Sequence, residues 1–130
     1  MKPRILLVED NENNRYLAEF LLKREGLVVD VAVNGKEALD LARRKAPDLV
    51  VMDIQMPEMD GYETATEFKR EAALAEIPLV GVSSFAMAGD RAKALKAGFV
   101  GYIEKPINPE TFGREVSLFL RVRDENSTVR

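Results

Sequence analysis

Five short runs of β-branched and aliphatic residues recur along the 130-residue chain. They occupy residues 5–8, 28–32, 49–52, 79–82 and 100–103. Each run has the length of one β-strand. Between the runs the apolar residues follow helical spacing, as at Leu17, Phe20 and Leu21, which gathers them on one helix face. The pattern therefore predicts strands and helices in alternation, which is typical of an α/β fold.

The distribution of polar residues within the runs predicts where each strand lies. The first, third and fourth runs are apolar at successive positions, as expected for central parallel strands covered on both faces. Asp30 interrupts the second run and indicates an edge strand. Gly26 and Gly98 are placed to cap helices, and Asn108-Pro109 predicts the start of the last helix. We expect a doubly wound (βα)5 sheet of five parallel strands.

The chain is long enough for one core but not for two, and 46% of its residues are apolar. The pattern assigns residues 1–121 to this single domain. Residues 122–130 are polar and unpatterned, which predicts a C-terminal tail or the stub of a linker.

Composition excludes several kinds of chemistry. The sequence has no cysteine and no histidine, so disulfides, thiolate or imidazole zinc sites and triads with an imidazole base are ruled out. With 19 basic and 22 acidic residues the net charge is −3, which gives no electrostatic reason to bind nucleic acid or a membrane. No apolar run approaches the roughly 20 residues of a membrane span, and no signal peptide is visible. The expected location is cytoplasmic.

Chemically active side chains follow four of the five predicted strands: Glu9, Asp10, Asp53, Ser83 and Lys105. In an open α/β sheet, the carboxyl ends of the strands form the ligand-binding edge. Carboxylates that converge there raise one another's pKa unless a cation neutralises them. Oxygen ligands of this kind favour Mg²⁺. The sequence thus predicts an acidic magnesium site with a hydroxyl and an amine beside it.

Four segments, taken in order, resemble the receiver domain of two-component response regulators. They are residues 5–11, residues 52–61, Ser83 and residues 102–106. The resemblance covers residues from about 4 to 121 and implies a flavodoxin-like sheet with strand order 2-1-3-4-5. It also implies a signalling switch that catalyses its own phosphorylation and dephosphorylation rather than a metabolic enzyme.

The resemblance implies a role for each residue at the strand ends. Asp53 is the implied nucleophile, which accepts a phosphoryl group from a histidine kinase or phosphotransfer protein and forms an acyl phosphate. Asp10 is the implied direct Mg²⁺ ligand, and Glu9 binds the ion directly or through water. Asp53 itself and the backbone carbonyl of Gln55 complete the protein's ligands.

Lys105 and Ser83 are implied to contact the attached phosphoryl group. The switch couples Ser83 to the ring of Tyr102, and the altered face, which binds a downstream protein, comprises residues 88–97, the fifth strand and the last helix. The implied oligomeric state is a monomer or a weak dimer.

Three residues are expected to shape the site without reacting. Pro57 and Gly61 shape the loop after Asp53, and Gly61 is expected at a positive φ or a close approach. Pro106 follows a bond that is usually cis in the family, an arrangement expected to aim Lys105 into the site.

The sequence departs from the family pattern near Ser83, which stands where threonine is more usual. Ser84 stands where alanine or glycine is common, and either a hydrogen bond or a turn contact is open to it. We hypothesise that Phe85 shields the phosphoryl group from water.

Two alternatives to a stand-alone response regulator remain at this stage. In the first, the chain is a receiver excised from a hybrid histidine kinase, or a truncated regulator. In the second, it is a Mg²⁺-dependent phosphohydrolase, which is disfavoured because Gln55 stands where such an enzyme needs a second acid.

Overall fold

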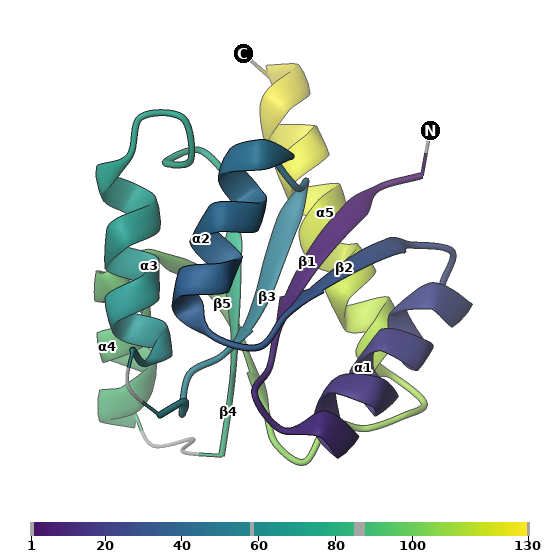
Figure 1. Cartoon of the computed structure of the whole chain (residues 1–130). Helices are drawn as coiled ribbons and strands as arrows, with labels where there is room; N and C mark the ends of the chain where they lie inside the picture. The colour runs from purple at the N-terminus through teal and green to yellow at the C-terminus, as the bar shows by residue number, and fades with distance from the viewer. Residues whose placement is uncertain (1, 58, 85–87, 130) are drawn as a thin grey trace.

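The computed structural model describes residues 2–57, 59–84 and 88–129. Strands and helices alternate throughout: β1 (Arg4–Val8), α1 (Glu12–Arg24), β2 (Val28–Ala32), α2 (Gly35–Arg44), β3 (Leu49–Asp53), α3 (Gly61–Arg70), β4 (Leu79–Ser83), α4 (Ala88–Ala97), β5 (Phe99–Glu104) and α5 (Phe112–Val129). The five strands are parallel and lie in the order β2-β1-β3-β4-β5 (Figure 1). The predicted doubly wound sheet and its strand order 2-1-3-4-5 are confirmed.

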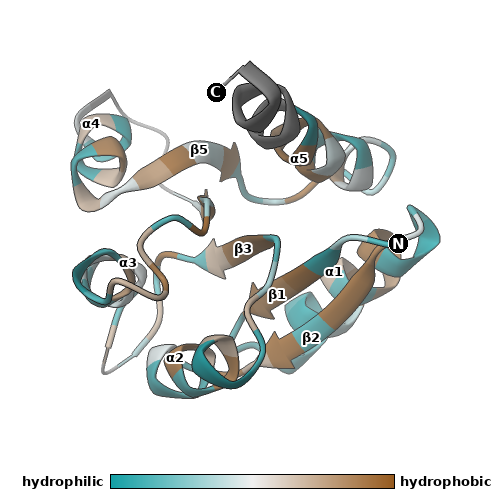
Figure 2. Ribbon diagram, turned by 90° about the horizontal axis from the view of Figure 1, so that it is seen from above, coloured by the Kyte–Doolittle hydropathy of each residue, from teal (hydrophilic) through white to brown (hydrophobic). Residues whose placement is uncertain are grey.

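Helices cover both faces of the sheet. α2, α3 and α4 lie on one face and α1 and α5 on the other (Figure 1). β1 contributes to both layers, because Leu6 and Val8 pack toward the first group of helices and Ile5 and Leu7 toward the second. This double cover explains why the central strands are apolar at successive positions (Figure 2).

β2 is an edge strand, as Asp30 predicts. Most of its residues are only half-buried, and the Asp30 carboxylate pairs with the Arg4 guanidinium on β1 at 2.7 Å. An edge position allows this aspartate to remain hydrated and paired. Asp30, which interrupts the apolar run, therefore lowers the stability of the sheet only slightly.

Local capping signals fix most of the helix ends. Gly26 and Gly98 have φ values of 90° and 111°, so the predicted left-handed caps are confirmed. The expected start of the last helix at Pro109 is wrong: Asn108 accepts from the Glu110 and Phe112 backbone N–H groups and forms a separate turn, so α5 begins at Phe112.

The C-terminal residues differ from the expected unpatterned tail. The backbone of α5 stays helical through Val129, so it continues across most of residues 122–130. The division of the chain at residue 121 remains a prediction. Within the described residues, no helix combines the length and apolar character needed to cross a bilayer.

Gly61 holds the loop after β3 against the end of that strand. Its backbone N–H donates to the Ile54 carbonyl at 2.9 Å, and a Cβ atom at Gly61 would lie 2.6 Å from Ile54 Cα and 3.0 Å from the Asp53 carbonyl oxygen. The requirement for glycine is therefore the close approach that the sequence suggests, and it fixes where Asp53 is presented.

Gly61→Ala is expected to lower the free energy of unfolding by about 1–3 kcal/mol, because the new methyl group meets backbone atoms that cannot turn aside. Urea denaturation measures the loss. Gly89→Ala is the matched control, since nothing lies within 4 Å of its Cβ position on α4. Equal stabilities of the two variants would contradict this account.

Candidate functional site

Strand order places the candidate site at the carboxyl edge of the sheet. β1 lies between β2 and β3, so the chain winds in opposite directions from β1, and a crevice forms where the winding reverses. Asp53 ends β3 and Ser83 ends β4, while Glu9 follows β1 and Lys105 follows β5. All four residues are contributed by neighbouring strands.

Three carboxylates meet in this crevice. Asp53 and Glu9 are 4% and 5% exposed, and Asp10 beside them is exposed to solvent. One carboxylate oxygen from each residue lies within 4.8 Å of the other two. The convergence predicted from the sequence is therefore present.

The first turn of α1 holds the two acids that follow β1. The Asn11 backbone N–H donates to Glu9 Oε2 at 3.0 Å, and the Asn11 side chain caps α1 by accepting from the Asn14 N–H. The Arg15 guanidinium donates to the carbonyl oxygens of Glu9 and Asp10 at 3.1 and 3.4 Å. Asn11 and Arg15 are site residues that the sequence analysis missed, although an asparagine before a helical pattern is a recognisable N-cap signal.

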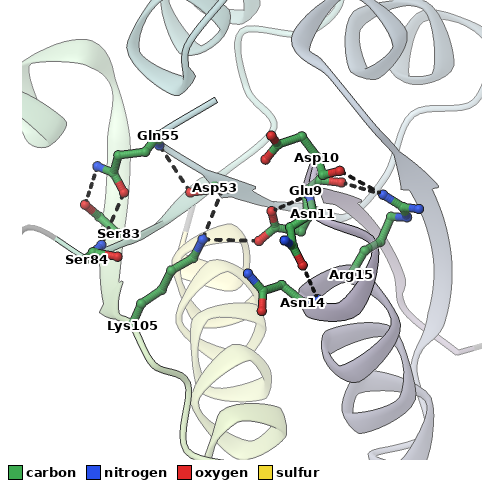
Figure 3. A network of polar contacts seen from close by, with 10 residues as sticks. All are labelled: Glu9, Asp10, Asn11, Asn14, Arg15, Asp53, Gln55, Ser83, Ser84 and Lys105. Carbon is green, nitrogen blue, oxygen red and sulfur yellow. Dashed lines mark hydrogen bonds and ion pairs between the residues drawn. The ribbon is translucent and has the colours of Figure 1, made fainter. Parts of the chain in front are cut away.

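Lys105 joins the two buried acids. Its Nζ atom lies 3.2 Å from Glu9 Oε1 and 3.1 Å from Asp53 Oδ2 (Figure 3). The Lys105 backbone N–H donates to the Ser83 carbonyl oxygen at 2.8 Å, which fixes the start of the loop after β5. The Lys105–Pro106 peptide bond is cis, as the family resemblance implies.

Burial and charge act on the ionisation of this group. Burial of Glu9 and the neighbouring negative charge of Asp53 raise the pKa of Glu9 to about 7, although the Asn11 N–H and Lys105 oppose the shift. Burial alone would lower the pKa of Lys105, but hydrogen bonds and charge interactions with Asp53 and Glu9 outweigh it and raise this pKa above its ordinary value. Lys105 is therefore a permanent cation in the site.

One ammonium does not balance three carboxylates. With Glu9, Asp10 and Asp53 ionised, the cluster with Lys105 carries a formal charge of −2. Hard oxygen donors with a surplus of two negative charges suit a divalent ion such as Mg²⁺. The donor set thus fits the metal that the sequence predicts.

Gln55 connects Asp53 to the end of β4. Its backbone N–H donates to Asp53 Oδ1 at 3.1 Å. Its side-chain Nε2 donates to Ser83 Oγ at 2.6 Å, and its Oε1 accepts from the Ser84 N–H at 3.2 Å (Figure 3). This bond uses the Ser84 backbone N–H, which alanine or glycine would also offer, so the role of the Ser84 side chain stays a prediction. These side-chain contacts are not predicted from the sequence, because nothing in the chain signals a contact across 28 residues.

Tyr102 lies on β5 beside β4. Its ring is half-buried and the Arg91 guanidinium lies 5.9 Å from the ring centroid. The Tyr102 hydroxyl is buried and has no hydrogen-bond partner among the described residues.

Two further predicted residues lie in the loops beside the site. Pro57 lies exposed in the loop after β3. Phe85, the residue expected to shield the phosphoryl group, lies outside the described residues.

A cavity of about 470 Å³ adjoins the acids. Its polar lining residues are Glu9, Asn14, Asp53, Ser84 and Lys105, and its apolar lining includes Leu17 on α1 and Ile107 in the loop after β5. The acidic cluster can therefore be approached along α1.

Comparison with known proteins agrees with this geometry. The family model of the response regulator receiver domain matches residues 5–117. The chain is 40% identical over 120 residues to the polar-differentiation response regulator DivK of Brucella anthropi, which covers 92% of this chain and 98% of that protein.

Solved structures of similar proteins share the fold. The receiver domain of the sensor histidine kinase PA1611 from Pseudomonas aeruginosa, with a magnesium ion coordinated in its active-site cleft, superposes with a TM-score of 0.83 at 30% identity, covering 92% of this chain and 98% of that one. The Vibrio cholerae chemotaxis protein CheY4 gives a TM-score of 0.85 at 25% identity, covering 90% and 98%.

The metal-free protein should lose stability as the pH rises from 6 to 8. The pKa of Glu9 is about 7 in the native state and near 4.5 in the unfolded chain. Between these values the native state binds one proton more than the unfolded state, which favours folding, and this contribution to the free energy of unfolding is lost as Glu9 ionises. The expected loss is about 1 kcal/mol of unfolding free energy, measured by urea denaturation in the presence of a chelator.

Glu9→Gln supplies the control for this measurement. The variant cannot titrate at this position, and the chain has no histidine to titrate in the same window. Its unfolding free energy should therefore change less between pH 6 and 8. The same pH dependence in both proteins would show that Glu9 does not carry the effect.

Proposed function

Because the chain belongs to the response regulator receiver domain family, a family of phosphoaspartate signalling switches, we propose that Asp53 is its phosphoryl acceptor. One observation carries this assignment: Asp53 is buried at the end of β3, within the acidic cluster and 3.1 Å from the Lys105 ammonium. The arrangement presents one carboxylate to a donor and surrounds it with charge-compensating groups.

The proposed reaction is transfer from a phosphohistidine of a histidine kinase or phosphotransfer protein. A carboxylate oxygen of Asp53 attacks phosphorus, a P–O bond forms, the P–N bond breaks and the electron pair leaves with the imidazole. Lys105 holds a positive charge where phosphoryl oxygens arrive. These 130 residues contain no histidine, so the phosphohistidine lies outside them.

Glu9, Asp10, Asp53 and the backbone carbonyl of Gln55 are the residues that would hold Mg²⁺. The bound ion supplies charge neutralisation between the anionic acceptor and the incoming phosphoryl group. Receiver domains bind Mg²⁺ in an acidic pocket, as in the PA1611 receiver, and the present chain has such a pocket. The assignment of individual ligands is the proposal.

Ser83 and Tyr102 are the proposed switch pair. They lie on adjacent strands, with Gly81 paired to Tyr102 and Ser83 paired to Glu104. Movement of the Ser83 hydroxyl toward a phosphoryl group on Asp53 would change the packing beside Tyr102, whose hydroxyl is buried without a partner in the described part of the chain. Such a contact biases an existing equilibrium between two states.

Two exposed apolar regions suit two kinds of protein partner. Tyr16, Leu17 and Phe20 are exposed on α1, and Leu17 also lines the cavity that reaches Asp53, which favours docking of the phosphodonor along α1. Leu95, Val100 and Leu118 are exposed on α4, β5 and α5, the face expected to bind a downstream target.

We propose that the protein is a monomer or a weak dimer and that it acts in the cytoplasm.

No second function gains comparable support. A phosphohydrolase would need a general acid where Gln55 stands, and the Gln55 amide is engaged with Ser83 and Ser84. The similarity to DivK and to the receiver domain of a sensor histidine kinase suits both a stand-alone regulator and a receiver within a larger protein.

Incubation with Mg²⁺ and a small acyl phosphate should add one phosphoryl group, detected by intact mass. Asp53→Asn should abolish the gain because an amide is a poor nucleophile. Asp40→Asn, on the surface of α2, should retain it. Unchanged phosphorylation of Asp53→Asn would place the acceptor elsewhere and overturn the proposal.

Mg²⁺ should stabilise the protein by about 1.4 kcal/mol at ten times its dissociation constant, since the ion binds the native cluster and not the unfolded chain. Thermal melting with and without Mg²⁺ measures the gain. Asp10→Ala should lose most of it, while Glu12→Ala, an exposed acid outside the cluster, should keep it. An equal gain in wild type and Asp10→Ala would refute the metal site.

A further inference from the structure

The Gln55 side chain forms a two-point contact with the end of β4. Its Nε2 donates to Ser83 Oγ at 2.6 Å, and its Oε1 accepts from the Ser84 backbone N–H at 3.2 Å. Both bonds connect segments 28 or 29 residues apart in the chain. Ser83 is fully buried, so this contact holds its hydroxyl at a defined place.

The contact turns Ser83 toward the loop after β3. Figure 3 shows the Ser83 hydroxyl directed at the Gln55 amide, on the opposite side of Asp53 from Glu9 and Asp10. For its proton to reach a phosphoryl oxygen on Asp53, Oγ has to move from this position. Because Gln55 is also anchored at the Ser84 N–H, that movement disturbs both hydrogen bonds.

Gln55 also contacts the phosphoryl acceptor itself. Its backbone N–H donates to Asp53 Oδ1 at 3.1 Å. One residue therefore bonds through its backbone to the carboxylate that would be modified and through its side chain to the hydroxyl that would respond.

We propose that the Gln55 side chain is a latch that holds Ser83 and Ser84 in the unphosphorylated arrangement and releases them when Asp53 carries a phosphoryl group. Gln55 is in this view a positioning residue: its amide stabilises the resting state and thereby weakens the affinity of the site for a phosphoryl group. The inference rests on the proposed function, since it assumes that Asp53 is the acceptor. It concerns only the Gln55 side chain, so the backbone carbonyl assigned to Mg²⁺ is untouched by substitution.

Affinity for beryllofluoride, a phosphoryl mimic, tests the latch in the presence of Mg²⁺. Gln55→Ala removes both side-chain bonds, and Gln55→Asn keeps the amide but is one methylene too short to make them. Both variants should bind beryllofluoride about 3- to 10-fold more tightly than wild type, the range set by the net strength of a hydrogen bond. Weaker or unchanged binding in both variants would overturn the latch, because a merely structural contact does not restrain the switch.

A double-mutant cycle shows whether the effect passes through Ser83. In a Ser83→Ala background the bond to Oγ is already absent and only the bond to the Ser84 N–H remains, so adding Gln55→Ala should tighten beryllofluoride binding by a smaller factor than it does in the wild type. A full effect in that background would show that Gln55 acts by another route and would overturn the proposal.

The resting contact can also be observed directly. Gln55 is the only glutamine in the chain, so its carboxamide gives one assignable pair of NMR resonances. Beryllofluoride should shift this pair toward the position of a solvated amide and speed exchange of the Ser84 N–H. Unchanged resonances in a protein that binds beryllofluoride would overturn the latch alone, whereas failure of the wild type to bind it would overturn the latch and the proposed acceptor together.

Discussion

Two carboxylates are buried side by side at one edge of the sheet, and a single ammonium lies between them. Asp53 and Glu9 are each almost completely shielded from water, and Lys105 contacts both. Burial of like charges is costly, and the raised pKa of Glu9 records that cost. A fold selected only for stability has no reason to retain such a group, so the arrangement supports the proposed binding of a cation and a phosphoryl group.

The fold makes this burial possible. Parallel strands covered on both faces bring residues from β1, β3 and β5 to a common edge, while the reversal of winding beside β1 opens a crevice there. The close contact of Gly61 with Ile54 fixes the loop behind Asp53, and the N-terminal turn of α1 fixes Glu9. The acids are therefore held by backbone interactions and remain close together despite their repulsion.

Much of this could be predicted from the sequence. Continuous apolar runs identified the central strands, Asp30 identified the edge, and polar residues at the ends of the runs identified the site, because each of these signals is local. The start of α5 was misplaced because Asn108-Pro109 is equally suited to the turn that precedes the helix. The side-chain bonds of Gln55 could not be predicted, since they depend on how two loops from different strands meet in space.

Asp53 lies between two environments of different character. On one side, Glu9 and Lys105 form an ion pair and are held by backbone hydrogen bonds at the start of α1 and of the loop after β5, so that charge is concentrated there. On the other side, Gln55 and Ser83 meet through neutral hydrogen bonds, each of modest net strength, which a charged ligand can replace. In the proposed switch, this asymmetry would let one side hold the phosphoryl group by charge while the other side moves, and it would connect the chemistry at Asp53 to a conformational change in the neighbouring strands β4 and β5.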